Sequence, residues 1–157
     1  MLDDETLKEV GLFAIEFSTL DKLIATLATA ILECTEWNIA QYLTERLTDG
    51  RKLEQIEAVS KKLANAHGLL DADVHKVLLE QIGLAKGIVD ERNTVIHGEV
   101  TIDQGNRPVI QLKKQAVEVS PRALSELVEK IDRVAYGLIT AYVDFMDAVY
   151  KARTAGG

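Results

Sequence analysis

A long run of apolar residues at helical spacing near the N-terminus is the feature that most constrains this fold. From Asp4 to about Glu33, these residues recur in steps of three and four, at Leu7, Val10, Ala14, Phe17, Leu20, Ile24, Leu27 and Ile31. The steps place them on one stripe of an amphipathic helix, whose start Asp3 or Asp4 is expected to cap. At 1.5 Å per residue this helix is roughly 40 Å long, which exceeds what one partner helix of ordinary length covers. We therefore expect part of the stripe to face a second subunit.

The segment 38–67 has the same helical period in two pieces. Asn38 is expected to cap the first piece, and residues 48–50 mark a break before the second. His67-Gly68 closes the segment, because glycine readily adopts the left-handed conformation that follows many helix ends.

Two further long helices are predicted in the C-terminal half. One begins at Asp71 or Asp73, carries apolar residues at helical spacing and ends at Gly98. The other follows Ser120-Pro121, where the serine can cap the helix and the proline suits its first position.

Between these two helices the pattern changes from helical spacing to alternation. Residues 100–102 and 109–112 flank a Gly105-Asn106 turn and predict a β-hairpin. We therefore predict an all-α protein, an antiparallel four-helix-type bundle with a small β-hairpin between the third and last long helices.

Length and composition favour one cytoplasmic domain. The chain has 157 residues, of which 47% are hydrophobic, enough to bury its own core. We expect a single helical domain over residues 1–153 and a flexible tail over 154–157. The single Cys34 rules out an intramolecular disulfide and a cysteine-based zinc site, as is usual in a reducing compartment. The most apolar stretch, 17–32, contains two charged residues and is predicted to be a core helix, not a membrane span.

Charge limits the kinds of partner. There are 18 lysines and arginines against 25 aspartates and glutamates, a net charge of −7, which argues against broad, non-specific nucleic-acid binding. RNA, if bound, is expected in a local cleft. Residues 99–114 have an excess of one positive charge, which either guides RNA or is ordinary solvated charge: Arg107, Lys113 and Lys114 against Glu99 and Asp103. No cofactor or metal is expected, since Asp73 and His75 would point about 200° apart on a helix.

The segment 90–99 carries side chains that a helical core does not require. Arg92, Asn93 and His97 lie at the expected end of an apolar helix. A guanidinium that is always charged, beside an imidazole that titrates near neutrality, is the minimal set for handling a phosphodiester. Helix ends also favour cations for local reasons, and a lysine precedes His67 at the same spacing at another helix end. That second helix end lacks the arginine followed by an amide.

The segment from Arg92 to His97, RNTVIH, resembles the RxxxxH signature of HEPN (higher eukaryotes and prokaryotes nucleotide-binding) domains. In that family a polar residue often follows the arginine, and the motif lies in the C-terminal part of a helix within a small bundle. Many members are metal-independent endoribonucleases of toxin, defence or RNA-processing systems, with the site at a dimer interface. The resemblance covers roughly residues 7–150, but only the six-residue motif is specific.

The resemblance implies that His97 acts as a general base or acid, that Arg92 binds the scissile phosphate, and that Asn93 orients Arg92, His97 or the substrate. The 2′-hydroxyl of the RNA would be the nucleophile. On a helix Arg92 and His97 lie about 140° apart, and the motif supplies one histidine, so we expect two motifs to meet in a homodimer. HEPN toxins silenced by adenylylation carry a tyrosine where this chain has Glu99, so that regulation is not expected. Whether an antitoxin exists is left open.

Two alternatives to an enzyme stay open. One is a non-catalytic HEPN-like module that binds RNA, a nucleotide or a protein partner. The other is a structural helical adaptor in which Arg92 serves as a capping and ion-pair residue. The acidic residues Asp90, Glu91 and Glu99 count against nuclease activity, because carboxylates so close to the motif repel RNA.

Overall fold

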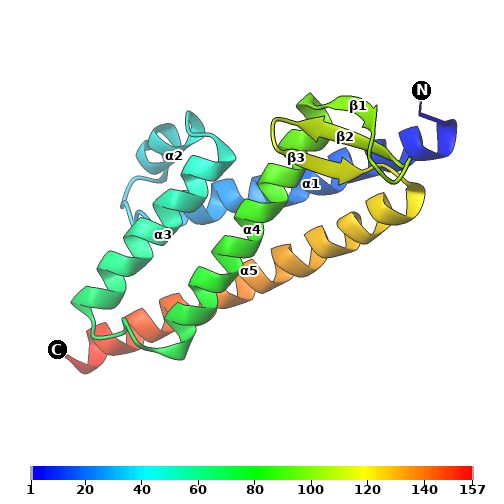
Figure 1. Ribbon diagram of the computed structural model, residues 1–157. Coiled ribbons are helices and arrows are strands. Elements are labelled where there is room, and N and C mark those ends of the chain that lie inside the picture. Colours follow the sequence, from blue (N-terminus) through cyan, green and yellow to red (C-terminus); the bar gives the residue numbers. More distant parts are fainter. Residues whose placement is uncertain (1, 157) are drawn as a thin grey trace. The chain divides into compact units, whose positions relative to one another are not determined.

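The computed structural model describes residues 2–156, and these residues are mostly α-helical with one small antiparallel sheet (Figure 1). In chain order the elements are α1 (Asp4–Ala30), α2 (Trp37–Glu45), α3 (Asp49–Ala66), α4 (Asp73–His97), β1 (Glu99–Ile102), β2 (Pro108–Leu112), β3 (Gln115–Glu118) and α5 (Pro121–Ala155). The predicted helical class and the β element between the last two long helices are confirmed. No helix within the described residues has the length and apolar character needed to span a membrane.

The chain forms two compact units, each described by itself below. The sheet unit consists of residues 2–20 and 87–133, and the helical unit of residues 21–86 and 134–156. α5 continues to Ala155, and Gly157 of the expected tail lies outside the described residues.

The helical unit has an aliphatic and aromatic core, and polar contacts link its helices. Its fully buried large side chains come from α1, α3, α4 and α5 or directly follow α1: Ile24, Ile31, Leu53, Ile56, Leu78, Ile82 and Phe145. Gln55 on α3 donates a hydrogen bond to the carbonyl oxygen of Ala28 at 2.7 Å. Glu57 on α3 accepts from Lys86 on α4 and from Lys61, and these two hydrogen-bonded ammonium groups lower the pKa of Glu57 to about 2.

The helix starts in this unit differ in part from those expected. Thr48 caps α3 by accepting a hydrogen bond from the Arg51 amide, and residues 49 and 50 form the first turn of α3 instead of a break. The expectation that Asn38 caps α2 is wrong. Glu36 occupies that position in an extended conformation, without a capping bond, and Asn38 lies inside the first turn.

The sheet unit combines the first turns of α1, the end of α4, the three strands and the start of α5. The apolar stripe of α1 includes Phe13, which is fully buried, whereas Leu7 of the expected stripe is exposed. The predicted caps at both helix starts are confirmed: Asp3 accepts from the amide of Thr6, and Ser120 accepts from the amide of Ala123.

The sheet has the order β1-β2-β3, with both neighbouring pairs antiparallel. The β1–β2 hairpin matches the prediction, with Val100 opposite Ile110. The third strand was not predicted, because Lys113-Lys114 has none of the residues that usually mark a turn and β3 alternates only weakly. Figure 1 shows the sheet lying beside the C-terminal end of α4.

Gly98 is the joint between α4 and the sheet. α4 ends at His97, as predicted, but Gly98 does not adopt the left-handed backbone that Gly68 uses after α3 (φ 69°). A Cβ at Gly98 would lie 2.5 Å from Ile110 Cγ2 and 2.8 Å from the carbonyl oxygen of Gln111, and would also clash with Thr94. Glycine is therefore required here because β2 passes close to the helix end.

Candidate functional site

The candidate motif occupies the last two turns of α4 in the sheet unit. Arg92 and Asn93 are half-buried, and His97, the last residue of the helix, is exposed. The intervening Thr94 and Val95 are buried, which fixes the helix against the rest of the unit. The motif is thus carried on a rigid helix end with its polar groups near the surface.

Arg92 is held by a neutral amide and an aromatic ring. Its Nη1 donates to Asn93 Oδ1 at 3.0 Å, and its guanidinium carbon lies 5.2 Å from the centroid of the Phe17 ring. Within residues 2–156 no carboxylate forms an ion pair with Arg92, and the adjacent Glu91 pairs instead with Lys130 at 2.7 Å. A neutral amide and a ring face orient a guanidinium without cancelling its charge. Asn93, which was expected to orient Arg92, His97 or the substrate, forms its side-chain hydrogen bond with Arg92.

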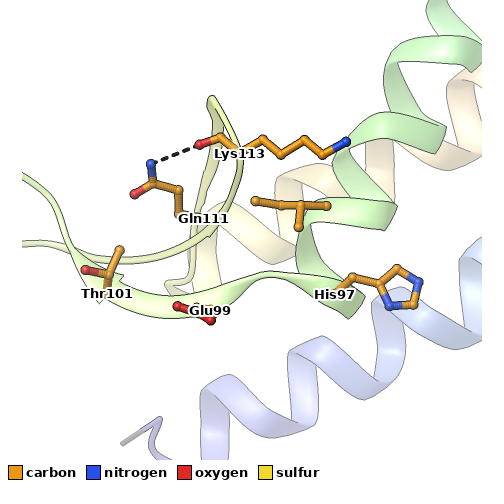
Figure 2. Close-up of a pocket in the computed structure, with 6 residues that line it drawn as sticks. His97, Glu99, Thr101, Gln111 and Lys113 are labelled. Atoms are coloured by element: carbon orange, nitrogen blue, oxygen red, sulfur yellow. Dashed lines mark hydrogen bonds between the residues drawn. The ribbon is translucent and has the colours of Figure 1, made fainter.

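His97 lies in an open hollow of about 370 Å³ between the end of α4 and the sheet. The hollow is lined by His97, Glu99, Thr101, Gln111, Leu112 and Lys113. Figure 2 shows the imidazole directed away from Glu99, while the Lys113 side chain extends toward α4. In the described part of the chain no side chain hydrogen-bonds to His97, so both ring nitrogens are accessible.

A second hollow of about 500 Å³ adjoins the first and contains the amide of Asn93. Its lining residues are Asp90, Asn93, Leu112, Lys113, Lys114 and Gln115. Leu112 and Lys113 belong to both hollows, so the turn after β2 separates the one with His97 from the one with Asn93. Arg92 lines neither of them. Helical geometry gives the reason, since five residues turn the helix by about 500° and leave Arg92 on another face.

Thr94 and Gln115 were not identified as site residues from the sequence. The Thr94 hydroxyl donates to the carbonyl oxygen of Asp90 at 3.0 Å and lies 3.1 Å from the amide oxygen of Gln115 on β3. This contact ties the base of the β2–β3 turn to the motif helix. The only sign of this contact in the sequence was a threonine inside the motif. Its partner, Gln115, lies on a strand that the sequence did not predict.

The three cations expected to give residues 99–114 an excess positive charge differ in whether a carboxylate pairs with them. Arg107 pairs with Asp103 at 2.7 Å and with Glu118 at 3.3 Å. Hydrogen bonds from Arg107, first from its backbone amide and then from its side chain, lower the pKa of the Asp103 carboxyl. Lys113 and Lys114, in contrast, make no ion pair within residues 2–156. Two lysines beside the motif, and not three cations, therefore keep a free charge.

The acidic segment at the start of α4 includes Asp73 and His75, the residues considered above as metal ligands. The residues that the structure describes contain no cluster of three potential metal ligands. His75 is buried, with Nδ1 3.3 Å from the carbonyl oxygen of Leu70 and its ring 5.4 Å from that of Phe145. His75 is therefore a core residue of the helical unit.

The site thus combines an oriented guanidinium, an exposed imidazole and two unpaired lysines around two adjoining hollows. These are groups that bind phosphate oxygens and transfer protons. Comparison with models of protein families, with curated proteins and with solved structures finds no match to this chain.

Proposed function

We propose that this chain is a HEPN-like, metal-independent endoribonuclease of the toxin, defence or RNA-processing type. One observation carries the proposal: Arg92 lies in an acidic segment, yet it is held by Asn93 and Phe17 and by no carboxylate. A guanidinium whose charge is kept free and whose orientation is fixed is suited to a phosphate whose negative charge rises in the transition state.

The proposed reaction needs only groups from the protein and the RNA. The 2′-hydroxyl attacks the adjacent phosphorus, and its proton passes to a general base. The bond from phosphorus to the 5′-oxygen breaks as a general acid protonates that oxygen. The products are a 2′,3′-cyclic phosphate and a 5′-hydroxyl. His97 supplies the base or the acid, Arg92 binds the non-bridging oxygens, and Asn93 orients Arg92.

A homodimer belongs to this proposal, because one motif supplies one histidine and does not turn Arg92 and His97 toward the same hollow. Apolar residues beside the motif offer a surface for a second copy: Ile96 is 42% exposed, Val100 53% and Ile102 65%. The antiparallel four-helix-type bundle and a cytoplasmic location are parts of the same proposal, and an antitoxin or other protein is a further candidate partner.

A second candidate is a HEPN-like module that binds RNA, a nucleotide or a protein without catalysis. The observation in its favour is that Glu99 lines the hollow of His97 and Asp90 lines that of Asn93. Carboxylates at these positions oppose the approach of a scissile phosphodiester to His97, which counts against turnover. Binding without turnover is the outcome that this candidate predicts.

The test is to incubate the protein with single-stranded RNA in excess EDTA and to analyse the product ends. We expect 2′,3′-cyclic phosphate ends, and a loss of cleavage of about a hundredfold or more in Arg92→Ala and His97→Ala. Circular dichroism and thermal unfolding should show that both variants keep the fold.

The chain supplies a matched control for the histidine. His67 follows α3 and is also a helix-end histidine before a glycine, and its Nε2 accepts a hydrogen bond from Arg153. His67→Ala should cleave RNA as the wild type does. Wild-type protein that never cleaves RNA, or cleavage that survives in His97→Ala, would contradict the proposed function.

A further inference from the structure

The turn between β2 and β3 consists of two lysines, and the first of them has a backbone conformation that disfavours lysine. Leu112 pairs with Gln115, so Lys113 and Lys114 alone form the turn. Lys113 has a φ of 55°, in the left-handed region that two-residue hairpins commonly require and that glycine or asparagine usually supplies. Residues held in such conformations cluster at functional sites.

The charges of this turn are not neutralised by the protein. Three other basic residues of the sheet unit have carboxylate partners, namely Arg107, Arg122 and Lys130, whereas Lys8, Arg92 and Arg133 have none within the described residues. Lys113 and Lys114 have none among the residues that the structure describes. Two adjacent ammonium groups without partners repel each other, so a turn of this composition is expected where an anion binds.

The position of the turn puts its lysines beside the candidate motif. Lys113 lines both hollows and Lys114 lines the one that contains Asn93. In Figure 2 the Lys113 side chain extends from the turn toward α4, the helix that carries His97. Gln111 donates to the carbonyl oxygen of Lys113 at 3.2 Å, which holds the turn in place. Lys113 therefore lies between the two hollows, and Lys114 lies on the side of the hollow that contains Asn93.

We infer that Lys113 and Lys114 bind successive phosphates of a single-stranded RNA, next to the phosphate that His97 acts on. This inference rests on the proposed function and adds the element that holds the strand. A single strand is favoured because successive phosphates are needed to engage both lysines and to continue from one hollow into the next. In an acidic protein this turn supplies a local attraction that the net charge does not.

The test measures RNA binding separately from cleavage, in the His97→Ala background. The probe is a fluorescein-labelled single-stranded oligoribonucleotide of mixed sequence, titrated at several salt concentrations. Each phosphate contact to a single strand contributes about 0.7 to the slope of log K against log salt. Lys113→Gln with Lys114→Gln should therefore weaken binding and reduce the slope by about 1.4.

A matched control removes the same charge elsewhere in the sheet unit. Lys8 and Arg133 are exposed, form no ion pair within the described residues and line neither hollow. Lys8→Gln with Arg133→Gln should keep the slope of the parent. Equal slopes in the two double variants, no RNA binding by the parent, or equally strong displacement by polyglutamate would overturn the inference. Cleavage by the wild-type protein in EDTA decides the proposed function independently of these results.

The variant Lys113→Gly separates the role of Lys113 in the turn from its role in RNA binding, because the thermal midpoint and the salt slope are measured on the same protein. Glycine relieves the backbone strain, so the thermal midpoint should rise while the salt slope falls by about 0.7. A raised midpoint with unchanged RNA binding would show that Lys113 serves the turn only and would overturn its part in the inference.

Discussion

The two turns of the small sheet solve the same folding problem in different ways. In the β1–β2 turn the residue with positive φ is Asn106, a type that tolerates it, and Asp103 accepts hydrogen bonds from the amides of Gly105 and Arg107. In the β2–β3 turn the residue with positive φ is Lys113, and no carboxylate pairs with it in the part of the chain that is described.

The difference separates a turn built for stability from one that carries unneutralised charge. In the β1–β2 turn the polar groups hydrogen-bond to one another, and Arg107 is paired with carboxylates of the protein itself. The β2–β3 turn has a strained residue and two free ammonium groups beside the candidate motif. Because both turns join strands of one sheet, substitutions in the turns and at Gly98 test whether they differ in this way.

The largest effect is expected at Gly98, the joint on which both turns depend. Gly98→Val would place a side chain against Ile110 and the backbone of Gln111, and should destabilise the protein by about 3 kcal/mol in urea unfolding. Gly105→Ala in the β1–β2 turn is the control, because a Cβ there meets only side-chain atoms at 3.3 Å or more. If the two variants unfold at the same urea concentration, the close packing at Gly98 is refuted.

A smaller effect is expected at Thr94, which ties the lysine turn to α4 through Gln115. Thr94→Val keeps the shape but removes the buried hydroxyl, and should cost about 1–2 kcal/mol in urea unfolding. Thr26→Val is the matched control, because Thr26 is exposed and its hydroxyl donates to the Lys22 carbonyl within the same helix. A cost at Thr94 no larger than at Thr26 would mean that the turn is not anchored in this way.

The strain in the lysine turn predicts a gain in stability. Lys113→Gly should raise the free energy of unfolding by about 1 kcal/mol, because a side chain is disfavoured at a φ of 55°. Asn106→Gly, the equivalent change in the other turn, should alter it by only a few tenths of a kcal/mol, because asparagine tolerates this region. Equal changes in the two turns would remove the contrast between them.

The smallest effect is a pH dependence confined to the β1–β2 turn. Asp103 has a pKa below its usual 3.8, so its folded-state contacts add stability that is complete above pH 3.8 and is lost as the pH falls below that value. The carboxyl carbon of Asp103 should titrate below pH 3.8 in NMR spectra, together with the Arg107 side-chain resonances. A midpoint for Asp103 at or above 3.8 would contradict the contacts described for this turn.

Much of the secondary structure could be predicted because it depends on neighbours along the chain. The apolar spacing located α1, α3, α4 and α5, and Ser120-Pro121 marked the start of α5. The prediction failed at Asn38, because the capping position is Glu36, two residues earlier, and at β3, whose turn has no glycine, proline or asparagine. The position of Arg92, Asn93 and His97 at the end of α4 was predicted, but not which of them share a hollow.

The helices, and the position of one arginine, one amide and one histidine at a helix end, follow from the sequence alone, because apolar spacing and capping preferences act over a few residues. Which charges remain without a partner depends on tertiary contacts. Arg107 and Lys113 have the same formal charge in the sequence, but Arg107 meets Asp103 and Glu118, and Lys113 meets no carboxylate within residues 2–156. The register of the sheet and the packing of α4 against it, which bring distant residues together, make that difference.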